Sequence, residues 1–318
     1  MTEDTQKSIQ QMIEIPNFID IVDFLGPKDV YLTLVKRQCD VRVKLDGRNL
    51  YIFGDTEKVE RATLVLEKML EVLGTGEKVL EQDVDLYLRQ SEQGHIMETS
   101  NDVLLKMGKT VVKAKTSHQK EYADAIENNI ITFAIGPSGT AKTYLAVTQA
   151  IKAFLEKKIE KIVITRSPIP LSGMDLGFLP GTSNDKMMPY VAPLTNVFLE
   201  FFTPEKFKTL LDADKISIIP LAYIRGYSLK NSFVIVDEAQ NLGIDGFKSI
   251  MTRLGVGSKL VICGDECQSD IGSRSGLEKA ASIMKTADGV SVIRMSEEDI
   301  VRSGIVAEVI RRFSEAGY

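Results

Sequence analysis

Short, predominantly apolar runs recur along the second part of the chain. Their length and their Val, Ile and Leu content are typical of strands buried on both faces of a parallel sheet. The intervening segments, such as residues 142–155, instead repeat apolar residues at helical spacing. The runs expected to be strands are residues 131–135, 161–165, 216–220, 233–237, 259–263 and 290–295. Alternating strands and helices predict an α/β domain with a parallel sheet.

A different pattern precedes this domain. Two runs of alternating polarity flank Asp46-Gly47, which is a strong signal for a β-hairpin. The segment after them repeats apolar residues at helical spacing, with charged residues between. The expected elements are a strand at 18–22, a helix after Gly26, strands at 40–44 and 49–53, and a helix at 56–73. This mixture predicts a small α+β domain.

The two patterns are separated by a polar, helix-prone stretch and a second turn signal at Gly108-Lys109. Glycines at Gly74, Gly76 and Gly94 bound the stretch, as is usual for linkers. We therefore expect three parts: a small domain over residues 1–80, a linker with a hairpin over 81–110, and the α/β domain over 111–318.

A glycine-containing loop lies between the first buried strand and the helix after it. Its residues are Gly136, Pro137, Ser138, Gly139, Thr140, Ala141, Lys142 and Thr143. Such a loop points backbone N–H groups and the positive end of the helix dipole at an anion. We expect Lys142 to reach the β- and γ-phosphates of a nucleotide, and the Thr143 hydroxyl to bind Mg²⁺. Ala141 stands where this motif usually has glycine, so its backbone is expected to adopt angles that alanine tolerates.

Two further apolar strands end in polar residues suited to acting on a nucleotide. Residues 233–236 run into Asp237, which suits a ligand of Mg²⁺, and Glu238, which suits a base that orients and deprotonates the attacking water. Residues 259–263 lead to Gln268, whose amide could sense the γ-phosphate. A protein that only binds nucleotide needs no carboxylate at position 238. The pattern therefore predicts an ATPase.

These motifs resemble the motor core of superfamily 1 helicases, in which the second motif reads Asp-Glu-x-Gln and the third Gly-Asp-x-x-Gln. The resemblance to the PhoH family is closer and covers roughly residues 111–313. The strings that carry it are Thr116–Tyr122, Thr165-Arg166, Leu176–Gly181, Tyr223–Gly226, Met251–Gly255 and Ser275–Leu277. It implies a RecA-like P-loop NTPase fold that uses ATP and Mg²⁺, with Gln119 reading adenine. Ala141 and the run Ser167–Pro170 depart from the family pattern, and these departures bear on substrate contacts more than on the ATPase itself.

The resemblance also implies an assembly. In superfamily 1 helicases ATP lies between two RecA-like domains, and the second supplies an arginine finger worth about 10³–10⁵ in rate. The strands expected here make one such domain. We therefore expect a neighbouring subunit to supply the arginine in a closed head-to-tail ring, and relatives are thought to form hexamers. Arg302 and Arg225 are the candidate fingers, and a surface salt bridge is the alternative for each.

Composition narrows the class of protein. Hydrophobic residues make up 44% and charged residues 26% of the chain, as in ordinary soluble proteins, and no run of about 20 apolar residues could span a bilayer. Three cysteines and no leader sequence lead us to expect a cytoplasmic protein without disulfides. A net charge of −5 means that any nucleic-acid site must be a local patch or lie inside an assembly.

The small domain resembles a KH-type RNA-binding module, which clamps the nucleic-acid backbone with a Gly-x-x-Gly loop. The matching turn here is Gly26-Pro27-Lys28-Asp29, whose final carboxylate would repel a phosphate. A modest basic cluster accompanies it, formed by Lys36, Arg37, Arg42, Lys44 and Arg48. RNA binding and a degenerate domain kept for assembly both remain open for this unit.

A long loop is expected from Ser167 to Tyr190, and loops of this length are usually functional. Its position resembles that of the helicase motif that touches single-stranded nucleic acid. Phe178 could stack on a base, or could fill a subunit interface together with Leu176 and Leu179.

Two functional hypotheses follow. The first is an RNA-coupled, helicase-like ATPase, with single-stranded RNA as partner and stimulator. The second is an ATP-driven stress or assembly factor that acts on protein partners and is indifferent to nucleic acid.

Overall fold

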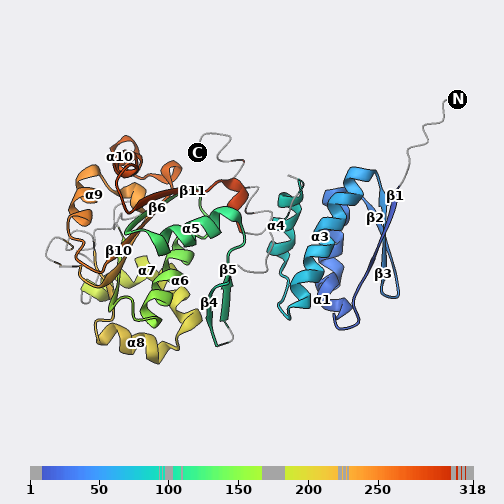
Figure 1. The fold of residues 1–318 in the computed structure, drawn as a ribbon, viewed down its shortest axis with the longest axis horizontal. Coiled ribbons are helices and arrows are strands. Elements are labelled where there is room, and N and C mark those ends of the chain that lie inside the picture. The colour runs from blue at the N-terminus through green and yellow to red at the C-terminus, as the bar shows by residue number, and fades with distance from the viewer. Residues whose placement is uncertain are drawn as a thin grey trace. The chain divides into compact units, whose positions relative to one another are not determined.

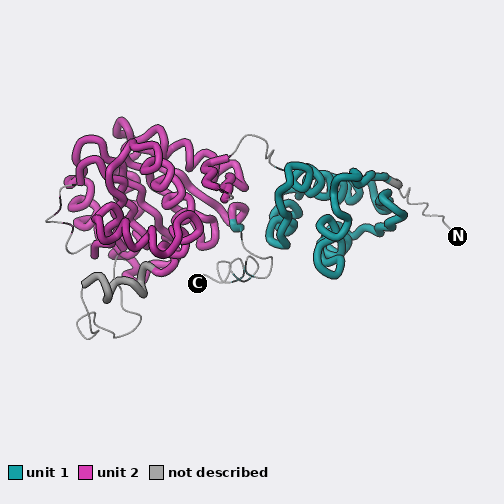
Figure 2. The backbone as a smooth tube through the Cα atoms, turned by 90° about the horizontal axis from the view of Figure 1, so that it is seen from below, with its two compact units in different colours: residues 1–100, 300–316 teal, residues 101–299, 317–318 magenta. Residues whose placement is uncertain are grey.

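The computed structural model divides the chain into two compact units. Residues 1–100 and 300–316 form the first, and residues 101–299 and 317–318 form the second (Figures 1 and 2). The structure describes residues 9–92, 94, 96, 103–108, 110–166, 183–220, 224, 227, 229–301, 306, 309 and 312, with side chains omitted at 9–10 and 183–191.

The first unit is a three-stranded antiparallel sheet with helices on one face (Figure 1). The strand order is β1-β3-β2, and β2 and β3 form the hairpin that Asp46-Gly47 predicts. Its elements are β1 (Ile9–Glu14), α1 (Ile21–Leu25), a 3-10 turn (Pro27–Asp29), α2 (Val30–Cys39), β2 (Arg42–Asp46), β3 (Asn49–Gly54), α3 (Thr56–Gly74) and α4 (Glu81–Ser91). The predicted α+β domain is confirmed.

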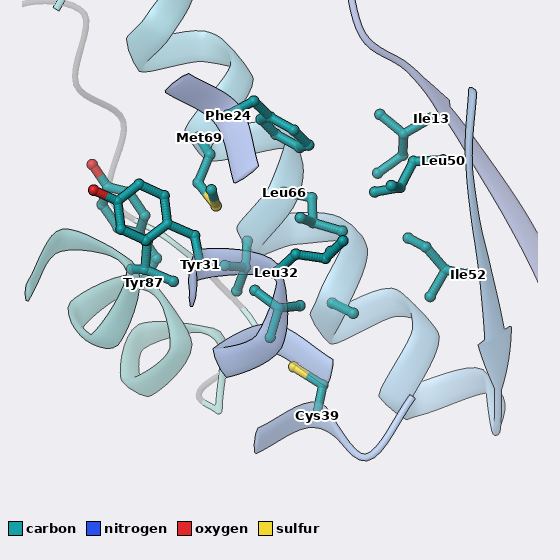
Figure 3. Close-up of a cluster of buried hydrophobic side chains, with 14 of the residues drawn as sticks. Ile13, Phe24, Tyr31, Leu32, Cys39, Leu50, Ile52, Leu66, Met69 and Tyr87 are labelled. Carbon is teal, nitrogen blue, oxygen red and sulfur yellow. The ribbon is translucent and has the colours of Figure 1, made fainter. Parts of the chain in front are cut away.

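The core of this unit lies between the sheet and the helices. The apolar stripe of α3, including Leu66 and Met69, packs in one cluster with Leu50 and Ile52 of β3 (Figure 3). These four residues are fully buried. Burying an aliphatic side chain contributes about 1.5–3 kcal/mol, so this stripe is what holds the long helix on the sheet.

The first strand is not where the sequence pattern placed it. Residues 18–22 were expected to form a strand, but β1 is Ile9–Glu14, and residue 21 already begins α1. Asp20 caps that helix by accepting a hydrogen bond from the Val22 backbone N–H at 2.8 Å. Phe18, read as a strand residue, is 76% exposed.

Helix α4 occupies the stretch that was expected to begin a linker. Val84, Tyr87 and Leu88 lie in the core cluster of the first unit, because the apolar residues of α4 repeat at helical spacing among its charges. Arg61 of α3 donates hydrogen bonds to the Leu88 carbonyl at 3.1 Å and to the Ser91 hydroxyl at 3.1 Å. The helix is therefore an integral part of the first unit.

The second unit contains a six-stranded parallel sheet, as expected from the apolar runs. The strand order is β11-β6-β10-β9-β7-β8, so β10 separates the strand before the glycine loop from the strand that ends at Asp237. The strands are β6 (Ile131–Ile135), β7 (Lys161–Arg166), β8 (Ile216–Ile218), β9 (Ser232–Asp237), β10 (Lys259–Gly264) and β11 (Val290–Arg294). All residues of β6 and β9 are buried, which explains their predominantly apolar character.

Helices cover both faces of this sheet (Figure 1). Helices α5 and α6 pack on one face, and α9 and α10 pack on the other through a cluster that includes Phe133 and Val234. The helices are α5 (Ser117–Asn128), α6 (Lys142–Leu155), α7 (Ser183–Phe201), α8 (Pro204–Asp212), α9 (Ile244–Met251) and α10 (Leu277–Met284). Strands β4 (Val103–Met107) and β5 (Thr110–Lys113) pair in a separate hairpin. No helix in the described part of the chain is long and apolar enough to cross a membrane.

The loop expected to run to Tyr190 ends earlier, because α7 begins at Ser183. Two prolines, Pro189 and Pro193, lie inside this helix. Because proline is disfavoured in helix interiors, the sequence did not indicate a helix here. Buried side chains at Leu194, Phe198 and Phe201 hold its second half in place. Phe178, Leu176 and Leu179 lie outside the described residues.

Candidate active site

The glycine loop connects β6 to α6 at the carboxyl edge of the parallel sheet. Gly136 is required at its start, because a Cβ there would lie 2.3 Å from the Met295 carbonyl oxygen. Gly139 has φ 86°, a left-handed conformation that glycine adopts freely. Helix α6 then begins at Lys142, so its first N–H groups face the loop. This is the geometry that binds phosphates.

Ala141 has a conformation that the sequence analysis did not expect. Its φ of 66° and ψ of 19° lie in the left-handed region, so the prediction of angles that alanine tolerates is wrong. The turn into α6 imposes this conformation whatever residue occupies it. A non-glycine residue in it costs roughly 1–2 kcal/mol, because Cβ approaches the following carbonyl oxygen.

Ala141→Gly is therefore expected to stabilise the second unit by about 1 kcal/mol, the steric relief exceeding the extra entropy of glycine in the unfolded chain. The free energy of unfolding in guanidinium chloride measures the effect. Ala153→Gly, within α6, is the matched control and is expected to destabilise by about 1 kcal/mol. If Ala141→Gly destabilised as Ala153→Gly does, the left-handed assignment would be incorrect.

Lys142 lies inside the loop. Its Nζ donates hydrogen bonds to the carbonyl oxygens of Gly136 at 2.6 Å and Pro137 at 2.7 Å. Burial lowers the pKa of the ammonium group, and the nearby carboxylates of Asp265 and Asp237 oppose that shift. The positive charge thus lies within the loop, as a phosphate site requires.

Thr143 and Asp237, the two expected ligands of Mg²⁺, lie in contact. The Thr143 hydroxyl donates a hydrogen bond to Asp237 Oδ1 at 2.7 Å, joining the start of α6 to the end of β9. Burial raises the pKa of the Asp237 carboxyl, while the Thr143 hydrogen bond and the positive charge of Arg166 act in the opposite direction. The pair presents a hydroxyl and a carboxylate oxygen, the hard ligands that Mg²⁺ prefers.

Glu238 is held at both carboxylate oxygens. Arg166 Nη2 lies 2.8 Å from Oε1, and Gln240 Nε2 donates to Oε2 at 2.6 Å. Arg166 also reaches Asp237, with Nη1 3.6 Å from Oδ2. This contact follows from the sheet register, in which Arg166 of β7 is the partner of Asp237 of β9. Glu238 itself has φ 52°, a left-handed conformation that places it just beyond the strand.

Gln240 connects Glu238 to the end of β10. It is 1% exposed, and its Oε1 accepts a hydrogen bond from the Asp265 backbone N–H at 3.1 Å. Its Nε2 also donates to the Gln268 carbonyl at 3.4 Å. The Gln268 side chain is exposed in a one-turn 3-10 helix, so the sensing of γ-phosphate by its amide stays a prediction.

Gln119, expected to read adenine, is buried beside the loop. Its Oε1 accepts from the Lys115 backbone N–H at 2.8 Å, and its Nε2 donates to the Thr140 carbonyl at 3.4 Å. In the same helix, the Tyr122 hydroxyl donates to the Lys142 carbonyl at 3.2 Å. Helix α5 therefore supports the loop directly, and adenine recognition by Gln119 stays a prediction.

The structure brings together the residues of the loop, Asp237 and Glu238, and adds two that were not expected at the centre of the site. Arg166 and Gln240 belong to strings that carry the resemblance to known motifs, but neither was assigned a role in the site. Arg225 and Arg302, the expected fingers, lie outside the described residues. The pairing of β7 with β9 brings Arg166 to the site, and the sequence alone does not reveal which strands pair.

The chain is similar to known proteins over most of its length. Residues 111–314 match the profile of the family described as PhoH-like protein. The PhoH-like protein of Bacillus subtilis is 34% identical over 97% of this chain and 98% of its own length. That of Mycobacterium tuberculosis strain H37Rv is 34% identical over 97% of this chain and 90% of its own length. Among solved structures, the UvsW helicase from bacteriophage T4 matches at 11% identity over 73% of this chain and 78% of that chain, with a TM-score of 0.36.

Proposed function

The chain belongs to the PhoH family, and on that premise we propose that it is a Mg²⁺-dependent ATPase whose hydrolysis is coupled to single-stranded RNA, acting as a helicase-like motor in a homo-oligomeric ring. The observation that carries the proposal is the contact of Thr143 with Asp237 beside a Glu238 whose two oxygens are both fixed. A phosphate loop, a metal ligand pair and an oriented base are the parts that ATP hydrolysis needs.

The loop and Lys142 would bind the phosphates of ATP. The N–H groups of the loop and of the first turn of α6 point at the phosphates, and Lys142 exchanges its bonds to the Gly136 and Pro137 carbonyls for bonds to phosphate oxygens. The bonds to the carbonyls and the bonds to the phosphates are both charge-assisted. We therefore expect the ammonium group to change partners at little cost while the side chain stays buried.

Thr143 and Asp237 would hold Mg²⁺, which when bound neutralises charge on the β- and γ-phosphates. Mg²⁺ commonly takes one or two carboxylates and completes its shell with water and phosphate oxygens. That suits a hydroxyl and one carboxylate. It also agrees with the described residues, which contain no group of three or more His, Cys, Asp or Glu side chains able to hold a metal.

Glu238 would take the proton of the attacking water. Arg166 and Gln240 orient its carboxylate, one at each oxygen, as a positioned base requires. Arg166 and Gln240 are positioning residues, because they act through Glu238.

Coupling to RNA is supported by the place of Arg166 in the chain. It is the last residue of β7 and leads directly into the loop expected from Ser167 to Tyr190, whose position resembles that of the helicase motif that touches single-stranded nucleic acid. A substrate that moved the end of β7 would change the hydrogen bond between Arg166 and Glu238. A neighbouring subunit would supply the arginine finger, with Arg225 and Arg302 as the candidates.

The second candidate function is an ATP-driven assembly factor that acts on protein partners. Asp29 and the net charge of −5 favour it, since both work against nucleic-acid binding.

The rate of phosphate release from ATP, with and without single-stranded RNA at low and physiological salt, separates the two functions. We expect RNA to raise the rate, and the stimulation to weaken with salt as phosphate contacts are screened. Glu238→Gln with the same RNA controls for contaminating ATPases. A wild-type rate that is indifferent to RNA would contradict RNA coupling and favour the assembly factor.

A further inference from the structure

The sheet of the first unit has one face without helices. Along β3, Leu50 and Ile52 point into the core, as Figure 3 shows. Asn49, Tyr51 and Phe53 alternate with them and are only partly buried. Helices lie on the core side alone (Figure 1), so the central strand presents two aromatic rings on its open side.

The strand register gives each ring a cation as its neighbour. Tyr51 pairs with Met12 of β1 on one side and with Lys44 of β2 on the other, and Phe53 pairs with Arg42 of β2. Side chains opposite each other on one face of an antiparallel sheet have Cβ atoms about 4.5–5.5 Å apart. We call Met12, Arg42, Lys44, Tyr51 and Phe53 the open-face cluster.

The two positive charges of this cluster, on Arg42 and Lys44, are available to bind a ligand. Within the described part of the chain, neither the Arg42 nor the Lys44 side chain has a hydrogen bond or ion pair, and both residues are exposed. Arg48 differs from them, because its guanidinium donates to the carbonyls of Pro16 at 2.7 Å and Ile19 at 3.1 Å. Of the basic cluster expected from sequence, Arg48 is therefore structural, while Arg42 and Lys44 can serve a ligand.

The face is polarised along the strands. Beyond the cluster, the next row across the sheet is Glu14, Asn49 and Asp46. An anionic ligand is thus attracted to the end that carries the rings and repelled from the other end. Free cations beside partly exposed aromatic rings suit a single nucleic-acid strand, since bases stack on the rings while cations contact the backbone.

We propose that the open-face cluster binds single-stranded RNA, with bases stacked on Tyr51 and Phe53 and phosphates contacted by Lys44 and Arg42. The two rings lie about 6.6 Å apart along the strand, roughly twice the 3.4 Å separation of stacked bases, so each takes a base from an extended strand. The inference deepens the proposed RNA coupling and rests on it for the choice of RNA. The surface is separate from the Gly26–Asp29 turn, where a carboxylate repels phosphate.

Binding of a dye-labelled oligouridine to the full chain, followed by fluorescence anisotropy, tests the stacking. Tyr51→Ala and Phe53→Ala are each expected to weaken binding about tenfold, the size of one base–aromatic stack. Tyr51→Phe and Phe53→Tyr keep the rings and are expected to bind as wild type. Circular dichroism verifies that each variant is folded, and a matched oligodeoxyuridine reports whether the face prefers RNA.

The cations give a separate readout. Lys44→Ala and Arg42→Ala are each expected to reduce the slope of log affinity against log salt concentration by about 0.7. Arg37→Ala removes the same charge from the exposed side of α2 and is expected to leave the slope unchanged. Photo-crosslinking with 4-thiouridine, mapped by mass spectrometry, is expected to label β2 and β3.

Failure of this inference is distinct from failure of the proposed function. If RNA bound and stimulated ATPase equally in folded Tyr51→Ala and Phe53→Ala variants, the inference would be overturned and the RNA-coupled ATPase would stand. If RNA binding depended on the rings but RNA left the ATPase rate unchanged, RNA binding by the open-face cluster would be supported and the RNA coupling of the ATPase would be contradicted. If wild type bound no oligonucleotide while ring removal changed its oligomeric state, the face would be a protein contact and the inference would be wrong.

Discussion

Glu238→Gln is expected to lower the rate of ATP hydrolysis by about 10²–10⁴-fold while ATP affinity stays within a few-fold of wild type. Positioned proton transfer contributes about that factor, and an amide cannot accept the proton of water. The loop, Lys142 and the Thr143–Asp237 pair are untouched, so binding is retained. Steady-state phosphate release and the affinity for a fluorescent ATP analogue, measured on one preparation, give both numbers.

Glu160→Gln is the matched control for this change. Glu160 is an exposed glutamate that accepts a hydrogen bond from Asn231 at 3.0 Å, away from the site, and its replacement is expected to leave the rate unchanged. If Glu238→Gln hydrolysed ATP at the wild-type rate, Glu238 would not be the base.

Lys142→Ala is expected to weaken ATP binding about 100-fold or more. Hydrogen bonds to charged groups contribute about 1.5–3 kcal/mol each, and the Lys142 ammonium group would make such bonds to the phosphate oxygens in place of those to the Gly136 and Pro137 carbonyls. Equilibrium binding of labelled ATP measures the change.

Lys152→Ala removes a lysine from the same helix and serves as the control. Lys152 pairs with Glu127 at 3.0 Å on the surface, and an exposed pair of this kind contributes little. Unchanged ATP affinity in Lys142→Ala would show that nucleotide does not bind in this loop.

The parallel sheet and the core of the site were predictable because both rest on local patterns. A strand buried on both faces must be apolar throughout, so β6 and β9 are visible in the sequence. The polar residues that follow such strands meet at one edge of the sheet, which is why Thr143 and Asp237 were expected together and lie 2.7 Å apart.

The elements that were misread depend on partners remote in sequence. Strand β1 lies at an edge of its sheet and begins Ile9-Gln10-Gln11, so its pattern is weak, whereas the apolar residues near Phe18 looked more like a strand. Helix α7 contains two prolines and is held by burial of its second half. In each case tertiary packing outweighs local preference.

The roles of Ala141, Arg166 and Gln240 could not be derived from sequence for a related reason. The left-handed conformation of Ala141 is imposed by the turn into α6, against the preference of alanine. Arg166 reaches Glu238 because β7 lies beside β9, and Gln240 reaches Asp265 because β10 lies on the other side of β9. The order of the strands, which sequence patterns do not specify, determines all of these side-chain contacts.

The most direct test of the account is phosphate release from ATP by the purified wild-type chain with Mg²⁺, repeated after chelation of the metal. We predict steady multiple-turnover release that stops when Mg²⁺ is removed, because Thr143 and Asp237 then have no metal to hold against the phosphates. Tight binding of ATP without release of phosphate, in the presence of Mg²⁺ and single-stranded RNA, would contradict the claim that this site hydrolyses ATP.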